Sequence, residues 1–235
     1  MIYEHTDLLK ADFGSEEWLV DGILSAHDRM LLVARYKAGK SIWGQQLAHC
    51  VAGHYEFLTF QVPEQKVVLY IAGEGELDEW QIRARAMHRV FPVVEKKLFL
   101  WPLPKWRLNT ERGAAALIET AEEVKKEAGE YPALTVFDPV YALFKGSLRD
   151  DEAVNEFTHT LNVYQHETNS ALVVLHHERR PMRTNTGELS EDTSHEAFLG
   201  SALWLAGCRT LFLMKVEGRS KDRVWHPTDI VRRNI

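Results

Sequence analysis

Short apolar runs alternate with amphipathic segments along most of the chain, and this alternation constrains the fold more than any other feature. The strand-like runs lie at residues 30–33, 66–72, 97–100, 133–137, 171–175 and 210–214. Helical periodicity marks residues 42–51, 77–88, 111–127 and 151–167, and a short helix is predicted near residues 198–206. Such alternation is typical of a mostly parallel sheet with helices on both faces. We therefore predict an α/β fold with a C-terminal antiparallel hairpin that ends at Val231.

Length and composition favour one folded domain over residues 1–235. The chain is 45% hydrophobic and 26% charged, close to the averages of folded globular proteins, and it is too short for two ordinary domains and a linker. We interpret residues 1–28 as an N-terminal lead-in. Residues 179–196 contain Pro181 and Gly187 but no apolar periodicity, so we predict a mobile loop there.

The sequence contains no signal for export or for a membrane span. The N-terminus lacks a basic segment followed by an apolar one, and no window approaches ~18 apolar residues, so we expect a cytoplasmic protein. Cys50 and Cys208 lie far apart and lack the spacing of a zinc site or a disulfide framework. The formal charge of −6 argues against DNA binding through bulk positive potential, so any DNA contact has to be local.

The tripeptide Gly39-Lys40-Ser41 lies between an apolar strand and an amphipathic helix. In that context backbone N–H groups cradle phosphates, the lysine reaches the β- and γ-phosphates, and the serine holds Mg²⁺. A solvated lysine at a surface helix is the alternative. The usual leading glycine is Ala34 here, which is tolerable if its φ is negative. We predict that ATP contacts the whole loop: Arg35, Tyr36, Lys37, Ala38, Gly39, Lys40, Ser41 and Ile42.

Two carboxylates follow apolar runs and are candidates for the chemistry of hydrolysis. Asp138 ends a strand-like run 98 positions after Lys40 (138 − 40), where an acidic group can hold magnesium together with Ser41. Glu74 lies between two glycines after another such run, which suits a general base that orients water. The alternatives are a helix N-cap for Asp138 and a loop carboxylate that helps to start a helix for Glu74.

The pair His176-His177 closes the apolar run at residues 171–175. Adjacent strand residues point to opposite faces, so only one imidazole can readily face the nucleotide, and the pair is a poor zinc site. An imidazole that hydrogen-bonds a γ-phosphate can report its loss to the next loop. We assign His177 to the catalytic set and His176 to nucleotide contact, while a purely structural pair remains the alternative.

Together these residues resemble the RepA-like branch of the RecA superfamily, a family of hexameric replicative helicases. The resemblance extends from Trp18 to Gly200-Ser201. It implies a RecA-like ATPase core that uses ATP and Mg²⁺, with Glu74 as the catalytic glutamate and the paired histidines as the phosphate sensor. It also implies that Arg83, on the helix after Glu74, packs against adenine.

The same resemblance implies a homo-oligomeric ring that acts on single-stranded DNA. Arg209 matches an arginine finger that reaches the neighbouring subunit's nucleotide, so each catalytic site would be completed between protomers. Arg232 and Arg233 are weaker candidates that we interpret as surface residues. The loop at residues 179–196 matches the DNA-contacting loop but has no aromatic residue for base stacking. It would bind DNA phosphates through Arg179, Arg180 and Arg183.

Three functional hypotheses remain open at the level of sequence. The leading one is ATP hydrolysis coupled to movement on single-stranded DNA, in the replication or recombination of a plasmid, phage or virus. A second is a strand-exchange recombinase that forms helical filaments. The third is a nucleotide-gated, KaiC-like regulatory module, in which Ala34 marks slow or lost turnover.

Overall fold

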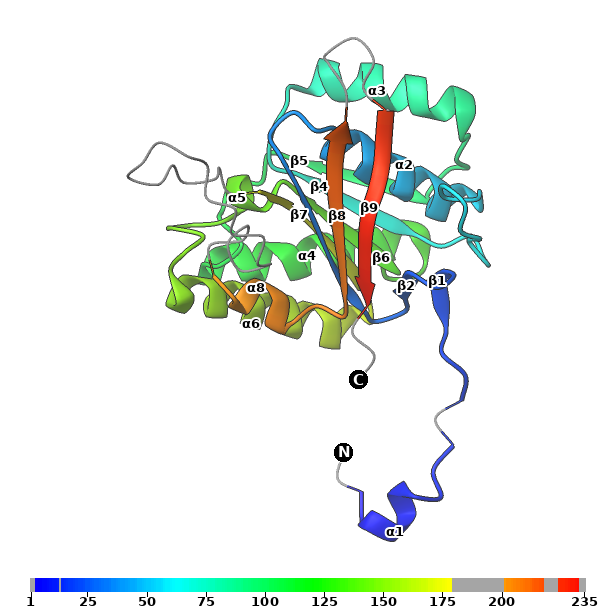
Figure 1. Cartoon of the computed structure of the whole chain (residues 1–235), viewed down its shortest axis with the longest axis vertical. Helices are drawn as coiled ribbons and strands as arrows, with labels where there is room; N and C mark the ends of the chain where they lie inside the picture. The colour runs from blue at the N-terminus through cyan, green and yellow to red at the C-terminus, as the bar shows by residue number, and fades with distance from the viewer. Residues whose placement is uncertain (1–2, 13, 179–200, 218–223, 233–235) are drawn as a thin grey trace.

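A mostly parallel, seven-stranded sheet forms the centre of the computed structural model, which describes residues 3–12, 14–178, 201–217 and 224–232 (Figure 1). The strands lie side by side in the order β5-β4-β6-β7-β3-β8-β9, and only β9 is antiparallel to its neighbour. Their bounds are β3 (Arg29–Ala34), β4 (Val68–Ala72), β5 (Leu98–Pro102), β6 (Leu134–Asp138), β7 (Ala171–His177), β8 (Thr210–Glu217) and β9 (Val224–Arg232).

Helices cover both faces of this sheet. One core cluster joins residues of α2 and α3 to one face, and the other joins α4, α6 and α8 to the opposite face. The described helices are α1 (His5–Leu8), α2 (Lys40–Gly53), α3 (Leu77–Val90), α4 (Glu111–Ala128), α5 (Val140–Leu143), α6 (Asp151–Thr168) and α8 (Leu203–Ala206). The predicted α/β class, parallel sheet, two-sided helix cover and C-terminal hairpin are confirmed.

The central strands are buried on both faces, which explains their continuous apolar sequences. Every residue of β3, β4 and β6 is buried, as expected for strands covered by helices on each side. The long helices begin and end at local signals. Thr110 caps α4 by accepting a hydrogen bond from the Gly113 N–H, and Gly129 ends that helix in the left-handed conformation.

Several short elements were absent from the prediction. Strands β1 (Trp18–Val20) and β2 (Leu24–Ser25) form a separate antiparallel pair inside the predicted lead-in, and their apolar side chains join the core. Helices α1 and α5 were also missed, since four residues carry too little periodicity. Of the predicted helix at residues 198–206, only residues 201–206 are described, and α8 forms there at Leu203–Ala206. The predicted loop at residues 179–196 lies outside the described residues. In the part of the chain that is described, no helix is both long and apolar enough to traverse a bilayer.

Candidate functional site

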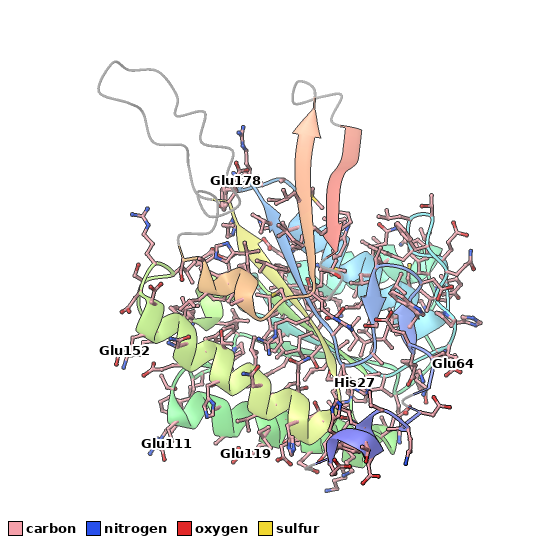
Figure 2. All side chains as sticks on the ribbon, turned by 60° about the horizontal axis from the view of Figure 1, so that its bottom comes forward. His27, Glu64, Glu111, Glu119, Glu152 and Glu178 are labelled. Atoms are coloured by element: carbon pink, nitrogen blue, oxygen red, sulfur yellow. The ribbon has the colours of Figure 1, made fainter. Side chains whose placement is uncertain are left out.

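The carboxyl ends of the parallel strands bring the predicted site residues to one edge of the sheet. Ala34 of β3 pairs with His177 of β7, and Ala72 of β4 pairs with Asp138 of β6. Figure 2 shows the polarity of the sheet, with Glu178 after β7 at one end and His27 before β3 at the other. Ligands of open α/β sheets bind at the carboxyl edge, and the loops that follow these strands form the candidate site there.

The loop between β3 and α2 has the backbone geometry of a phosphate cradle. Gly39 precedes α2 with a left-handed φ of 93°, and Lys37 also has a positive φ, of 59°. Ala34 ends β3 and is not among the described residues with positive φ, so its Cβ does not obstruct the turn. No described side chain caps α2, which leaves its first N–H groups available to an anion.

Lys40 is held inside this loop by three acceptors. Its Nζ donates to the carbonyl oxygens of Ala34 and Arg35, both at 3.1 Å, and to Nδ1 of His177 at 3.0 Å. The residue is 5% exposed, and this burial lowers the pKa of its ammonium group to about 8. Asp138, Glu74 and Glu178 oppose this shift by stabilising the charge. Lys40 is therefore a mostly protonated, preoriented cation at neutral pH.

Asp138 forms a hydrogen-bonded group with two hydroxyls. The Ser41 hydroxyl donates to one carboxylate oxygen at 3.1 Å, and the Tyr70 hydroxyl donates to the other at 2.6 Å. Burial raises the pKa of Asp138, while these two hydrogen bonds and Lys40 act in the opposite direction. Burial, followed by the charge of Asp138, also raises the pKa of Tyr70. The predicted metal residues Ser41 and Asp138 are thus in direct contact.

The donor set at Asp138 fits magnesium. Mg²⁺ prefers oxygen ligands and commonly uses one or two carboxylates together with substrate phosphates. Ser41 and Asp138 offer such oxygens beside the phosphate loop. Among the described residues no group of three or more His, Cys, Asp or Glu residues could form a cage by itself. A metal here would complete its coordination with nucleotide and water.

Glu74 lies in the loop after β4, at the same carboxyl edge of the sheet as Asp138. Gly75 has a φ of 88°, and the indole N–H of Trp80 donates to the Glu74 carbonyl at 2.8 Å, which fixes the backbone. Partial burial raises the pKa of the Glu74 carboxyl, the charge of Asp138 raises it further, and Lys40 lowers it. Glu74 is thus a solvent-accessible carboxyl within the electrostatic reach of both Lys40 and Asp138.

The two histidines lie on opposite faces of β7. His177 contacts Lys40, and its ring lies 4.9 Å from that of Tyr141 and 5.7 Å from that of Tyr36. Burial, then the charge of Lys40, lowers the pKa of His177 to about 4, so its imidazole is neutral at physiological pH. His176 instead packs against Trp204, with 5.1 Å between the ring centroids, and burial, then the charges of His177 and Lys40, lowers its pKa to about 4.

The predicted arginines are not gathered in one place. Arg83 on α3 lies 5.7 Å from the Trp80 ring, 3.5 Å from a Glu79 oxygen, and within electrostatic reach of Asp138. Arg209 lies at the opposite edge of the sheet from Lys40, because it immediately precedes β8 and its N–H donates to the Arg29 carbonyl. Its guanidinium lies 3.2 Å from Glu16. Some predicted residues lie outside the described part of the chain: Arg179, Arg180, Arg183, Arg233 and the side chain of Arg232.

Three aromatic residues of the site were missed at the level of sequence. Tyr70 and Trp80 contact each other at 5.2 Å between ring centroids, and they hold Asp138 and the Glu74 backbone in place. Tyr141 packs on His177 from α5. A hydroxyl inside the fully buried strand β4 was the available signal for Tyr70, because a buried phenol needs a partner.

Comparisons with known proteins agree with this arrangement. Residues 4–182 match the family model described as an AAA domain. A KaiC-like protein, PH0186 from the hyperthermophilic archaeon Pyrococcus horikoshii OT3, has a similar structure, with a TM-score of 0.54 and 11% identity over 92% of this chain and 83% of the other. A second solved structure, an ATPase domain, matches with a TM-score of 0.56 and 11% identity, over 81% of this chain and 70% of the other.

No curated protein matches the sequence. The two solved structures share the fold at low identity, and the family model covers both the phosphate loop and the strands that carry Asp138 and His177. The predicted RecA-superfamily assignment is confirmed. The chain belongs to the AAA domain family and is a P-loop ATPase with the RecA-like fold.

Proposed function

We propose that this protein is a Mg²⁺-dependent ATPase that assembles into a ring and moves on single-stranded DNA, in the manner of RepA-like replicative helicases. The contact of Lys40 with His177 carries the proposal, because it joins the phosphate-binding cation to a strand end that precedes the predicted DNA loop. The nearby Ser41–Asp138 pair and the accessible Glu74 carboxyl supply the remaining groups for hydrolysis.

Nucleotide binding would exchange the partners of Lys40. Its ammonium now donates to two carbonyls and an imidazole, and β- and γ-phosphate oxygens are stronger acceptors because they are charged. The first N–H groups of α2 would contact the same phosphates. When bound, Mg²⁺ would supply positive charge between phosphate oxygens, held by Ser41 and Asp138.

Glu74 is suited to orient the attacking water and to take its proton. The raised pKa of its carboxyl makes Glu74 a better proton acceptor than an ordinary glutamate. Trp80 and Gly75 fix the backbone on which this carboxyl is mounted. We therefore assign Glu74 as the general base and Arg83 as the adenine contact.

His177 is suited to sense the nucleotide. Its Nδ1 accepts a hydrogen bond from Lys40, and this bond is lost when Lys40 turns to phosphate. The adjacent residue, Glu178, pairs with Arg35 of the phosphate loop at 3.2 Å. The phosphate loop is therefore linked to the end of β7 by two contacts, Lys40–His177 and Arg35–Glu178. A change here would pass to residue 179, where the predicted DNA-contacting loop begins with Arg179, Arg180 and Arg183.

Arg209 is proposed to act between subunits. Its position at the far edge of the sheet from Lys40 argues against an action on its own subunit's nucleotide. A finger provided by a neighbour would neutralise charge in the transition state, and it would make hydrolysis depend on assembly, as in a hexameric ring.

A nucleotide-gated regulatory module is the second candidate, and the structural similarity to a KaiC-like protein favours it. Steady-state ATPase rates with and without single-stranded DNA separate the two. A DNA-stimulated rate that Lys40→Ala abolishes supports the motor. No turnover in either condition, with Lys40→Ala equally silent, would overturn it. A strand-exchange recombinase predicts helical filaments instead of closed rings in electron micrographs with DNA and an ATP analogue.

A further inference from the structure

The loop that joins β5 to α4 carries an exposed tryptophan surrounded by cations. Trp106 is 38% exposed, Lys105 Nζ lies 5.0 Å from its ring, and Arg112 Cζ lies 5.1 Å from it. Arg107 is exposed beside them. None of these three cations has a carboxylate within 4.0 Å among the described residues, whereas Arg35, Lys66, Arg83, Lys97 and Arg209 all do.

Charge on this loop departs from that of the whole protein. Residues 103–112 contain three cations and one carboxylate, Glu111, in a chain whose formal charge is −6. Figure 2 shows Glu111 at the periphery, at the start of α4. Cations of this kind contact phosphates locally even when the total charge is acidic, because interactions beyond about 10 Å are screened.

Backbone hydrogen bonds on both sides of Trp106 fix the loop to the rest of the fold. Leu103 N–H donates to the Ala72 carbonyl at 2.7 Å, and Leu108 N–H donates to the Leu143 carbonyl at 2.8 Å. A Cβ on Gly113 would collide with the Arg107 carbonyl oxygen, so α4 and the loop approach as closely as a glycine permits. A preformed aromatic platform loses little conformational entropy on binding.

A further hydrogen bond links the platform to the helix beside the ATPase site. The Arg107 guanidinium donates to the Ala142 carbonyl of α5. The preceding residue, Tyr141, packs on His177, which in turn contacts Lys40. The loop follows β5, so it lies at the carboxyl edge of the sheet together with Asp138. A continuous chain of contacts therefore connects Trp106 to the phosphate loop through α5.

We propose that Trp106, with Lys105, Arg107 and Arg112, is a stacking platform for single-stranded DNA. A base would stack on the indole face, and the three cations would contact the flanking phosphates. The proposal rests on the proposed DNA motor, and it supplies the aromatic contact that the predicted loop at residues 179–196 lacks. The unpaired bases of single-stranded DNA fit this site better than duplex DNA, whose bases are already stacked on one another.

The test measures the affinity of full-length protein for a fluorescently labelled oligo(dT) by anisotropy, with a non-hydrolysable ATP analogue. Trp106→Ala weakens binding by roughly tenfold, the cost of losing one stacked base, whereas Trp106→Phe retains most of the affinity. Lys105→Ala with Arg112→Ala lowers the salt dependence by about 0.7 in the logarithmic slope for each lost phosphate contact. Removing two exposed cations elsewhere, with Arg89→Ala and Lys126→Ala, is the matched control.

The outcomes separate the platform from the motor. If the wild type binds oligo(dT) and Trp106→Ala binds equally well, the platform is wrong and the DNA motor stands. If the wild type binds no single-stranded DNA, both proposals fail. If Trp106→Ala changes the particle mass in solution while DNA affinity per protomer is unchanged, Trp106 belongs to a contact between copies and the platform is again wrong. Thermal unfolding of each variant shows that it is folded.

Discussion

Lys40 places a positive charge in a buried position, and this has a cost in stability. Its pKa is lowered to about 8 from 10.5 because burial disfavours the charged form. Between these values the unfolded chain binds a proton that the native protein has released. The penalty is therefore full below pH 8 and disappears as the pH rises to 10.5. Bound nucleotide phosphates would offset this cost, because their negative charge stabilises the buried ammonium group.

We expect Lys40→Met to stabilise the nucleotide-free protein while it abolishes ATP binding. The lowered pKa corresponds to about 3.4 kcal/mol at pH 7, and three lost hydrogen bonds of about 1 kcal/mol each reduce the expected gain in the free energy of unfolding to about 0.4 kcal/mol. This gain shrinks as the pH approaches 10.5, since the wild-type penalty disappears there. Urea unfolding of both proteins at pH 7 and pH 10 measures the difference. A stability difference between the two proteins that is the same at pH 7 and pH 10 would contradict the penalty on the buried charge.

Replacement of Glu74 by glutamine tests the general base. Glu74→Gln is expected to lower kcat by about 10²–10⁴-fold and to leave ATP binding nearly unchanged, because the amide keeps the shape but cannot accept the proton. Because the pKa of Glu74 is raised, wild-type activity falls with acid at a pH above that of an ordinary glutamate. Glu76→Gln, two residues away and also exposed, is the control. If Glu74→Gln hydrolyses ATP at the wild-type rate, Glu74 is not the general base.

At the scale of elements, α2 approaches the sheet closely at Gly44. A Cβ at this position would lie 2.9 Å from Leu175 Cδ1 and 3.0 Å from the Tyr70 hydroxyl oxygen. That hydroxyl holds Asp138. The small residue therefore sets the distance between α2, which carries Ser41, and the strands that carry Tyr70 and Asp138, so helix packing and the Ser41–Asp138 contact both depend on it.

Gly44→Ala is expected to affect stability and metal dependence together. Overpacking lowers the free energy of unfolding by about 1–3 kcal/mol. Displacement of Tyr70 also raises the Mg²⁺ concentration needed for half-maximal ATP hydrolysis, because Asp138 loses its second hydrogen bond. Chemical denaturation and Mg²⁺ titrations check the two effects. Gln46→Ala, on the same helix, should change neither. A destabilised variant with normal Mg²⁺ dependence would separate α2 packing from the metal site.

Sequence predicted the long elements well because periodicity accumulates with length. The runs that became β3, β4, β6 and β7 end within two residues of the predicted positions. Elements of two to four residues, such as β2 and α5, depend on contacts that are distant in sequence. The same limit applies to the site. Strand ends indicated Asp138 and Glu74, whereas Tyr141 comes from α5 and has no local signal before α5 packs on β7.

At the scale of the whole molecule, the proposed catalytic residues are divided between the two edges of the sheet. Lys40, Ser41, Asp138, Glu74 and His177 share the carboxyl edge of the sheet, and Arg209 lies at the opposite edge. Assembly in a head-to-tail ring brings one edge of a protomer near the other edge of its neighbour. Arg209 now pairs with Glu16 at the surface, where both groups are partly exposed, so little free energy opposes a change of partner.

Mixing two inactive variants tests whether each site is shared. Lys40→Ala retains the finger but lacks the phosphate-binding lysine, and Arg209→Ala has the reverse defect. If Arg209 acts in trans, each homogeneous ring is inactive, while a random equimolar mixture regains roughly a quarter of the wild-type interfaces. ATPase rates of co-refolded mixtures measure this, with native mass spectrometry to establish that mixed rings exist. A mixed ring contains interfaces in which one subunit provides Lys40 and its neighbour provides Arg209. If mixed rings form and are inactive, Arg209 is not the residue that acts in trans.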